Sequence, residues 1–162
     1  MINIISIFVI IVLIGLLING VEDVHKNTWS KSFDSFVRNT DMPIIALENN
    51  GRAYNFIIDT GASLSLIDAR MLPYLEYNKL DAKCVTYGID GNKKEVEYIK
   101  LNLTEGNMIF QEAFQVRDDL GAFDNLKESY GITVAGLLGL PFLERYGAIL
   151  DLNSNTISIK KK

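Results

Sequence analysis

The chain has 162 residues, of which 48% are hydrophobic and 22% are charged, and its net charge is -4. This length and composition fit one globular domain with a core of its own, and no second folded domain fits. The negative charge and the lack of a Lys/Arg cluster argue against nucleic-acid binding. Cys84 and His25 are the only residues of their types, so the chain has no means to build an intrachain disulfide, a cysteine or histidine-rich metal site, or a Ser-His triad.

The chain begins with a long apolar run. Ile2 to Ile18 carries no charge and is almost wholly Ile, Leu and Val. As a helix it spans about 25 Å, slightly short of a hydrocarbon core of about 30 Å, and Asn19 to Val21 can extend it. We predict that residues 1–21 form a single-pass membrane anchor or uncleaved signal. A cleaved signal peptide is the alternative, but no basic residue precedes the run and no Ala-x-Ala site follows it. The side of the membrane stays open.

Residues 22–42 are expected to be a juxtamembrane linker. Within them, Asn27 to Arg38 spaces its large apolar residues as one face of a short amphipathic helix would. This face either lies on the bilayer surface or packs on the following domain as a stalk, and we favour packing. The apolar residues are Trp29, Phe33, Phe36 and Val37.

From Pro43, which opens a domain over residues 43–162, the pattern is all-β. Ile44 to Leu47 and Tyr54 to Ile58 are predicted strands, joined by a turn in which Asn50-Gly51 supplies the positive φ values of a tight hairpin. Further predicted elements are a strand over Leu64–Ile67, a short helix capped by Asp68 and ending at Pro73, a hairpin of Lys83–Ile89 with Lys93–Leu103, a hairpin of Lys100–Thr104 with Met108–Val116, a partly helical stretch over Arg117–Gly131, a strand over Val134–Leu138, a helix over Phe142–Tyr146, and strands over Ala148–Asp151 and Thr156–Ile159.

Asp59 is the first candidate for catalysis. Phe56 to Ile58 has the pattern of the end of a buried strand, after which the chain presents a carboxylate, a hydroxyl and a glycine. A charge at the edge of a core is costly, and it is normally kept only when it is paired, hydrogen-bonded or chemically used. Gly61 lets the backbone turn sharply, and the Thr60 hydroxyl can both donate and accept a hydrogen bond.

The stretch Asp59-Thr60-Gly61-Ala62, set between apolar flanks, resembles the active-site motif of the aspartic proteases. Further along, Gly136 to Leu143 resembles the second signature of that family, with Leu137, Leu138 and Gly139 forming its loop. The order and spacing resemble the single-motif, retropepsin-like branch over roughly Pro43 to Ile159. The resemblance implies the acid-protease fold, a closed or partly open β-barrel with one short C-terminal helix, here following an N-terminal transmembrane helix.

The resemblance also implies a homodimer, because each chain carries a single aspartate of this type and the family's mechanism needs two. Two carboxylates about 4 Å apart repel by roughly 4 kcal/mol at an effective dielectric near 20, so the pair shares one proton. Aspartic proteases are the standard example of such sharing. The ionised Asp59 activates a water, and the protonated one polarises the scissile carbonyl. No metal, cofactor or covalent intermediate is required.

The other loop residues take their expected roles from the same resemblance. Thr60 is expected to bond the partner's loop across the twofold axis, whereas a local turn hydroxyl is the alternative. Gly61 and Ala62 are expected to be small so that the two carboxylates can approach. Ser63 departs from the family, because many retroviral enzymes have an aspartate there, and its alternative role is that of a plain loop hydroxyl.

The tip of the longer hairpin is the candidate flap over an extended peptide substrate. Gly88, Ile89, Asp90 and Gly91 place two glycines around an apolar residue, as a bending cover would. A solvent-exposed hairpin explains the same glycines by turn chemistry. Asp90 departs from the glycine-rich tip of the retroviral enzymes.

Three hypotheses follow. The first is a membrane-anchored, homodimeric aspartic endopeptidase that cuts extended peptide segments between apolar side chains. The second is a non-catalytic retropepsin-like module for peptide binding or dimerisation at a membrane. The third is a tethered protease that acts only on a dedicated membrane substrate.

Overall fold

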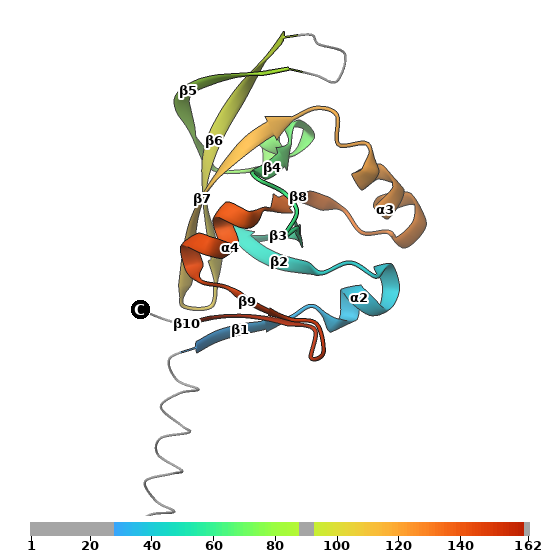
Figure 1. The fold of residues 1–162 in the computed structure, drawn as a ribbon. Helices are drawn as coiled ribbons and strands as arrows, with labels where there is room; N and C mark the ends of the chain where they lie inside the picture. The colour runs from blue at the N-terminus through green and yellow to red at the C-terminus, as the bar shows by residue number, and fades with distance from the viewer. Residues whose placement is uncertain (1–27, 88–92, 161–162) are drawn as a thin grey trace, which may run out of the picture.

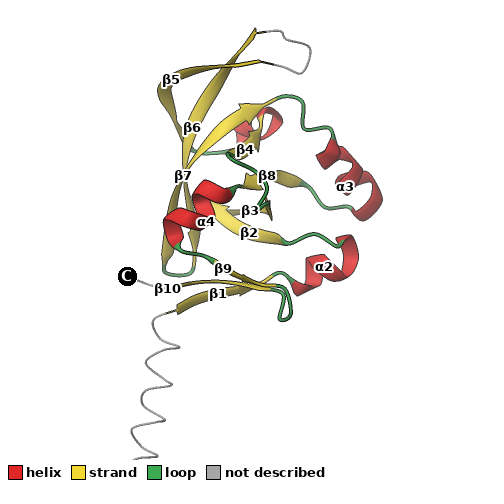
Figure 2. Cartoon of the chain, in the orientation of Figure 1, coloured by secondary structure: helices red, strands yellow, loops and turns green. Residues whose placement is uncertain are grey.

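The computed structural model describes residues 28–87 and 93–160, with side chains over 28–81 and 96–160. This part of the chain is mostly β with a few short helices (Figure 2). In chain order the elements are β1 (Thr28–Ser32), α2 (Asp34–Thr40), β2 (Ile44–Asn49), β3 (Arg52–Ile58), β4 (Ser65–Asp68), the 3-10 helix η1 (Ala69–Tyr74), β5 (Tyr77–Tyr87), β6 (Lys93–Glu105), β7 (Met108–Arg117), α3 (Ala122–Tyr130), β8 (Val134–Leu138), α4 (Leu140–Tyr146), β9 (Ile149–Asp151) and β10 (Thr156–Lys160).

The larger sheet brings together strands that are far apart in sequence. Within the described residues it has seven strands in the order β2-β3-β8-β4-β7-β6-β5, and β2 also pairs with β6 through Glu48 and Thr104. This extra pairing curls the sheet partly back on itself, in agreement with the expected partly open barrel. At its centre β3 and β8 run parallel, with Ile58 opposite Leu138, so their carboxyl ends lie side by side.

The core lies inside this curled sheet. Along β7, Phe110 and Phe114 point inward and are fully buried, because residues two apart in a strand share a face. Helix α4 closes the core from outside: the ring of Phe142 lies 5.6 Å from that of Phe110, and the Tyr146 ring meets Phe110 edge-on at 5.1 Å. The helix that follows the second signature is therefore fixed by aromatic packing.

A smaller apolar cluster joins α2 and α3 beside the end of β3. Phe123 and Leu126 of α3 pack with Ile44 of β2, and Phe36 of α2 and Ile57 of β3 cover them. Figure 1 shows the two helices on the same side of the molecule. Ile57, two residues before Asp59, therefore packs against this cluster.

The segment expected as a helix over Asn27 to Arg38 differs in the structure. Trp29 lies in the strand β1, which pairs antiparallel with β10 and sets Trp29 opposite Ile159, and α2 spans only 34–40. Trp29 is 8% exposed and Phe33 is fully buried, both in the main core, so packing on the domain is confirmed for these two residues. The helix prediction was wrong at its start because the strand's partner is at the other end of the chain, where local periodicity gives no information.

The proposed anchor, residues 1–21, lies outside the described residues. Within the described part, 28–87 and 93–160, no helix has the length and apolar character needed to cross a membrane.

The predicted β elements agree with the structure in kind and differ in length. The strand expected from Lys83 begins at Tyr77, and β6 continues unbroken from Lys93 to Glu105 where two overlapping strands were expected. The expected Asp68 cap is present, since its carboxylate accepts the Arg70 N–H at 2.9 Å, and the helix behind it is η1. The one short C-terminal helix of the implied fold is α4, and the partly helical stretch expected over Arg117–Gly131 contains α3.

Candidate active site

Asp59 lies directly after β3, where the strand leaves the core. Its backbone N–H donates to the Leu138 carbonyl of β8 at 3.0 Å, which ties the start of the loop to the neighbouring strand. The half-buried side chain turns back on its own loop, and its Oδ1 accepts the Gly61 N–H at 2.9 Å. The Ala62 N–H closes the turn on the Asp59 carbonyl at 3.3 Å. The carboxylate is therefore held in one orientation with part of its surface open to solvent.

The second signature loop packs directly on the Asp59 loop. The Leu140 N–H donates to the Ala62 carbonyl at 2.8 Å. At Gly139 a Cβ atom would lie 2.5 Å from the Leu64 carbonyl oxygen and 2.8 Å from that of Ala62, so only glycine allows the two backbones to come this close. The structure thus brings together the two stretches that the sequence singled out.

The remaining predicted loop residues differ in exposure. Thr60, Gly61 and Ser63 are exposed, and Ala62 is half-buried, so the outer face of the loop meets solvent in the single chain. In the second signature Leu138 and Gly139 are buried and Leu137 is half-buried.

Leu140, the residue after Gly139, lies at the surface of the described chain. It is 41% exposed, because it is the first residue of α4 and that helix buries Phe142 and Leu143 instead. The candidate flap residues Gly88, Ile89, Asp90 and Gly91 lie outside the described residues.

A buried polar network behind the loop was missed by the sequence analysis. The Ser65 hydroxyl donates to Oε1 of Glu112 at 2.8 Å and accepts the Gly139 N–H at 3.0 Å. Arg145 of α4 donates from Nη1 to Oε2 of Glu112 at 2.6 Å and to the Gln111 carbonyl at 2.9 Å.

Glu112 is 1% exposed. Its burial raises the pKa of its carboxyl, while the Ser65 hydrogen bond and the Arg145 charge act in the opposite direction. A signal for this carboxylate existed in the sequence: Glu112 alternates with Phe110 and Phe114 on the face of β7 that points into the core.

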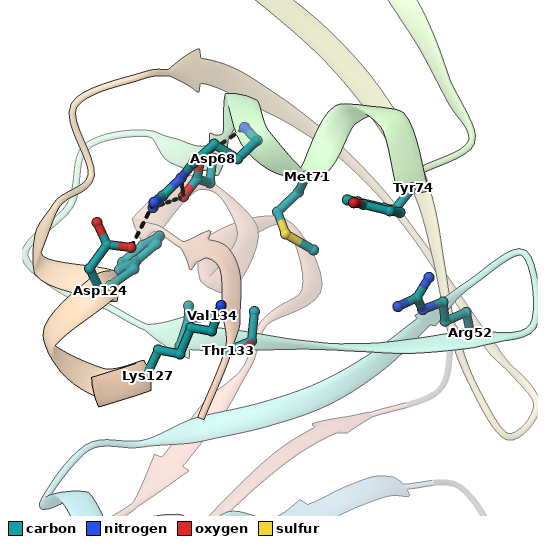
Figure 3. A pocket seen from close by; sticks show the side chains of 10 residues that line it. Arg52, Asp68, Met71, Tyr74, Asp124, Lys127, Thr133 and Val134 are labelled. Atoms are coloured by element: carbon teal, nitrogen blue, oxygen red, sulfur yellow. Dashed lines mark hydrogen bonds and ion pairs between the residues drawn. The ribbon is translucent and has the colours of Figure 1, made fainter. Parts of the chain in front are cut away.

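A second charged cluster lies at the other end of β3. Arg70 of η1 bridges Asp68 and Asp124 of α3, with nitrogen–oxygen distances of 2.6 Å to each carboxylate. These contacts line a cavity of about 310 Å³ that also reaches Arg52, the first residue of β3 (Figure 3). The strand separates this cavity from Asp59, so the cluster links η1 to α3 away from the candidate loop.

Across 28–87 and 93–160, His, Cys, Asp and Glu side chains do not gather in a group of three or more that could hold an ion.

No protein-family model matches the chain, and no curated protein matches it either. Among solved structures, the chain is similar to the retroviral protease-like domain of Ddi1 from Leishmania major, with a TM-score of 0.52 and 19% identity over 73% of this chain and 87% of that one. It is similar to a retropepsin-like aspartic protease from Rickettsia conorii, with a TM-score of 0.51 and 21% identity over 83% of this chain and 90% of that one. EIAV protease, complexed with the inhibitor HBY-793, is 20% identical with a TM-score of 0.48 over 68% of this chain and 93% of that one. At the identities of the first two, the likeness concerns the fold, and the chain has the retropepsin-like fold that its two motifs predict.

Proposed function

We propose that this protein is an aspartic endopeptidase whose active site forms when two copies bring their Asp59 loops together. One observation carries the proposal: within a retropepsin-like fold, Asp59 stands at the edge of the core with its carboxylate oriented by Gly61 and its loop packed on Gly139. A partly exposed carboxylate on a backbone held in one conformation has the features of a catalytic group, which must be both accessible and fixed in position.

The mechanism needs a pair of Asp59 carboxylates that share one proton. The ionised carboxylate takes a proton from a water held between them, and the water oxygen attacks the carbonyl carbon of the peptide bond. The protonated carboxylate donates to the carbonyl oxygen as its charge develops. When the tetrahedral intermediate collapses, the leaving nitrogen takes a proton from the pair and the C–N bond breaks. One hydroxyl of the intermediate returns its proton to the pair, which gives a carboxylic acid, an amine and the singly protonated pair again.

The exposure of the loop supports a second copy as the missing half. Thr60 and Gly61 face solvent, which leaves them available to a partner's loop. A twofold axis through this face would make each loop contact the other in the same way. In this proposal Thr60 bonds the partner's loop, Gly61 and Ala62 permit the approach, and Gly88 to Gly91 cover the bound peptide. Residues 2–18 hold the enzyme at a membrane as a single-pass anchor.

The test uses the full chain purified in detergent. Asp59→Asn keeps the size and the acceptor oxygen for Gly61 but removes the charge, so cleavage of an extended peptide library with apolar residues at the cut should fall to background. Asp81→Asn, an exposed change of the same kind on β5, is the matched control and should retain activity. Specific activity of the wild type should rise with protein concentration until the dimer is saturated.

The outcomes separate the hypotheses. Unchanged cleavage by Asp59→Asn would refute the assignment, as would full activity in a protein that sediments only as a monomer. A dimer that binds a statine-type analogue and cleaves nothing in the library would favour the non-catalytic peptide-binding module.

A further inference from the structure

The Asp59 loop is held in place by one short stretch of chain. The Asp59 N–H donates a hydrogen bond to the Leu138 carbonyl, and the Leu140 N–H donates one to the Ala62 carbonyl. The residues on both sides of Gly139 are therefore hydrogen-bonded to the loop. A Cβ atom at Gly139 would lie 2.5 Å from the Leu64 carbonyl oxygen, so the two backbones are in close contact there. The position of Gly139 therefore determines the position of the catalytic loop.

A side chain, not the backbone, holds the N–H of Gly139. The hydroxyl of Ser65 accepts this N–H at 3.0 Å in a buried environment. A hydroxyl has one proton and can rotate, so its orientation depends on where the proton finds an acceptor. Here the acceptor is Oε1 of Glu112 at 2.8 Å, which turns the lone pairs of Ser65 toward Gly139. The carboxylate thus orients the hydroxyl, and the hydroxyl orients the loop.

Packing alone does not account for Glu112. Its neighbours on the inward face of β7 are Phe110 and Phe114, and a carboxylate that is 1% exposed costs free energy unless it is paired. Arg145 provides the pairing at 2.6 Å from α4, the helix that begins right after Gly139. The ion pair and the hydroxyl together connect β7, β4 and α4 at the point where the two signature loops meet.

We propose that Glu112 and Ser65 are positioning residues of the proposed protease, which set the Asp59 loop against the second signature loop through the Gly139 N–H. The effect on activity rests on the proposed function, whereas the effect on the Gly139 amide does not. Neither residue touches the substrate in this proposal. Removal of the Glu112 or Ser65 side chain is expected to shift the Asp59 carboxylate from its reactive position, while Asp59 itself is retained.

The test compares four variants in the full chain. Ser65→Ala and Glu112→Leu both break the path to Gly139, and each should lower kcat by about 10- to 100-fold with KM within about threefold, since small displacements of reacting groups cost this much. Glu112→Gln keeps an acceptor for Ser65 and should recover most of kcat. Leu103→Val, a buried truncation at the β6 end that turns into β7, is the control for lost stability and should keep the wild-type kcat.

Hydrogen exchange of the Gly139 amide gives a readout that needs no activity. We expect exchange at least about tenfold faster in Ser65→Ala and Glu112→Leu than in Leu103→Val, at conditions where all of them are folded. Unchanged exchange in both variants would overturn the proposed path. Faster exchange with wild-type kcat in an active enzyme would overturn the positioning role while leaving the protease assignment intact. If the wild type itself cleaves nothing, the proposed function fails, and the exchange result still decides the hydrogen-bond path.

Discussion

Gly139→Ala tests most directly how tightly the two signature loops are packed. Gly139 has a φ of -86°, which any residue adopts, so the substitution brings no backbone strain of its own. The added methyl would meet the Leu64 carbonyl oxygen at 2.5 Å, its carbon at 2.7 Å and the Ala62 carbonyl oxygen at 2.8 Å. All three are backbone atoms, which cannot rotate away as a side chain can. The loop must therefore shift by several tenths of an ångström or more.

The expected cost is that of overpacking a buried site, about 1–3 kcal/mol of unfolding free energy. For a chain of this size that corresponds to a fall in Tm of roughly 2–4 °C per kcal/mol. Activity should fall more than stability explains, because the atoms displaced belong to the loop that carries Asp59. Urea denaturation followed by circular dichroism gives the first quantity, and peptide cleavage well below the transition gives the second.

Gly121→Ala is the matched control. Gly121 lies before α3 with a φ of -59°, and an added Cβ would meet nothing within 4 Å. This variant should unfold at or slightly above the wild-type denaturant concentration, since alanine reduces the entropy of the unfolded chain. Equal unfolding midpoints and equal cleavage rates in the two alanine variants would contradict the tight packing of the two loops.

Two further predictions concern stability. Burial raises the pKa of Glu112 above its ordinary 4.5. The folded state therefore binds the proton of this carboxyl group more tightly than the unfolded chain does. As a result, the contribution of Glu112 to stability falls as pH rises from 4.5 through the raised pKa. Urea midpoints measured across this range should decline less in Glu112→Gln than in the wild type, and parallel profiles would contradict the linkage. Trp29→Ala should cost about 3–5 kcal/mol, because Trp29 is buried edge-on against Phe110 at 5.2 Å. A loss below about 1 kcal/mol in the same denaturation assay would mean that β1 is a dispensable linker.

Much of the β architecture could be predicted from the sequence because it depends on local features. The strand over Val134–Leu138 has its predicted bounds as β8, since an apolar run bounded by glycine needs no distant partner to be recognised. Asn50 and Gly51 have φ values of 49° and 73°, as expected for the tight turn between β2 and β3. Asp59 stood out because it places a carboxylate directly after an apolar strand, whereas Gly139 was singled out by its resemblance to the family's second signature.

The tertiary structure decided what depends on distant partners. Trp29 has helical spacing with its neighbours, yet it lies in a strand because β10, from the other end of the chain, provides the backbone hydrogen bonds. Glu112 lies between Phe110 and Phe114 in the sequence, and only the folded chain places Ser65 and Arg145 around it. By itself the sequence determined which residues form strands, turns and the two signatures, because periodicity and turn chemistry act between near neighbours. Only the folded chain decided which carboxylate is buried and paired and which stands open, because burial and pairing are properties of residues that meet across the fold.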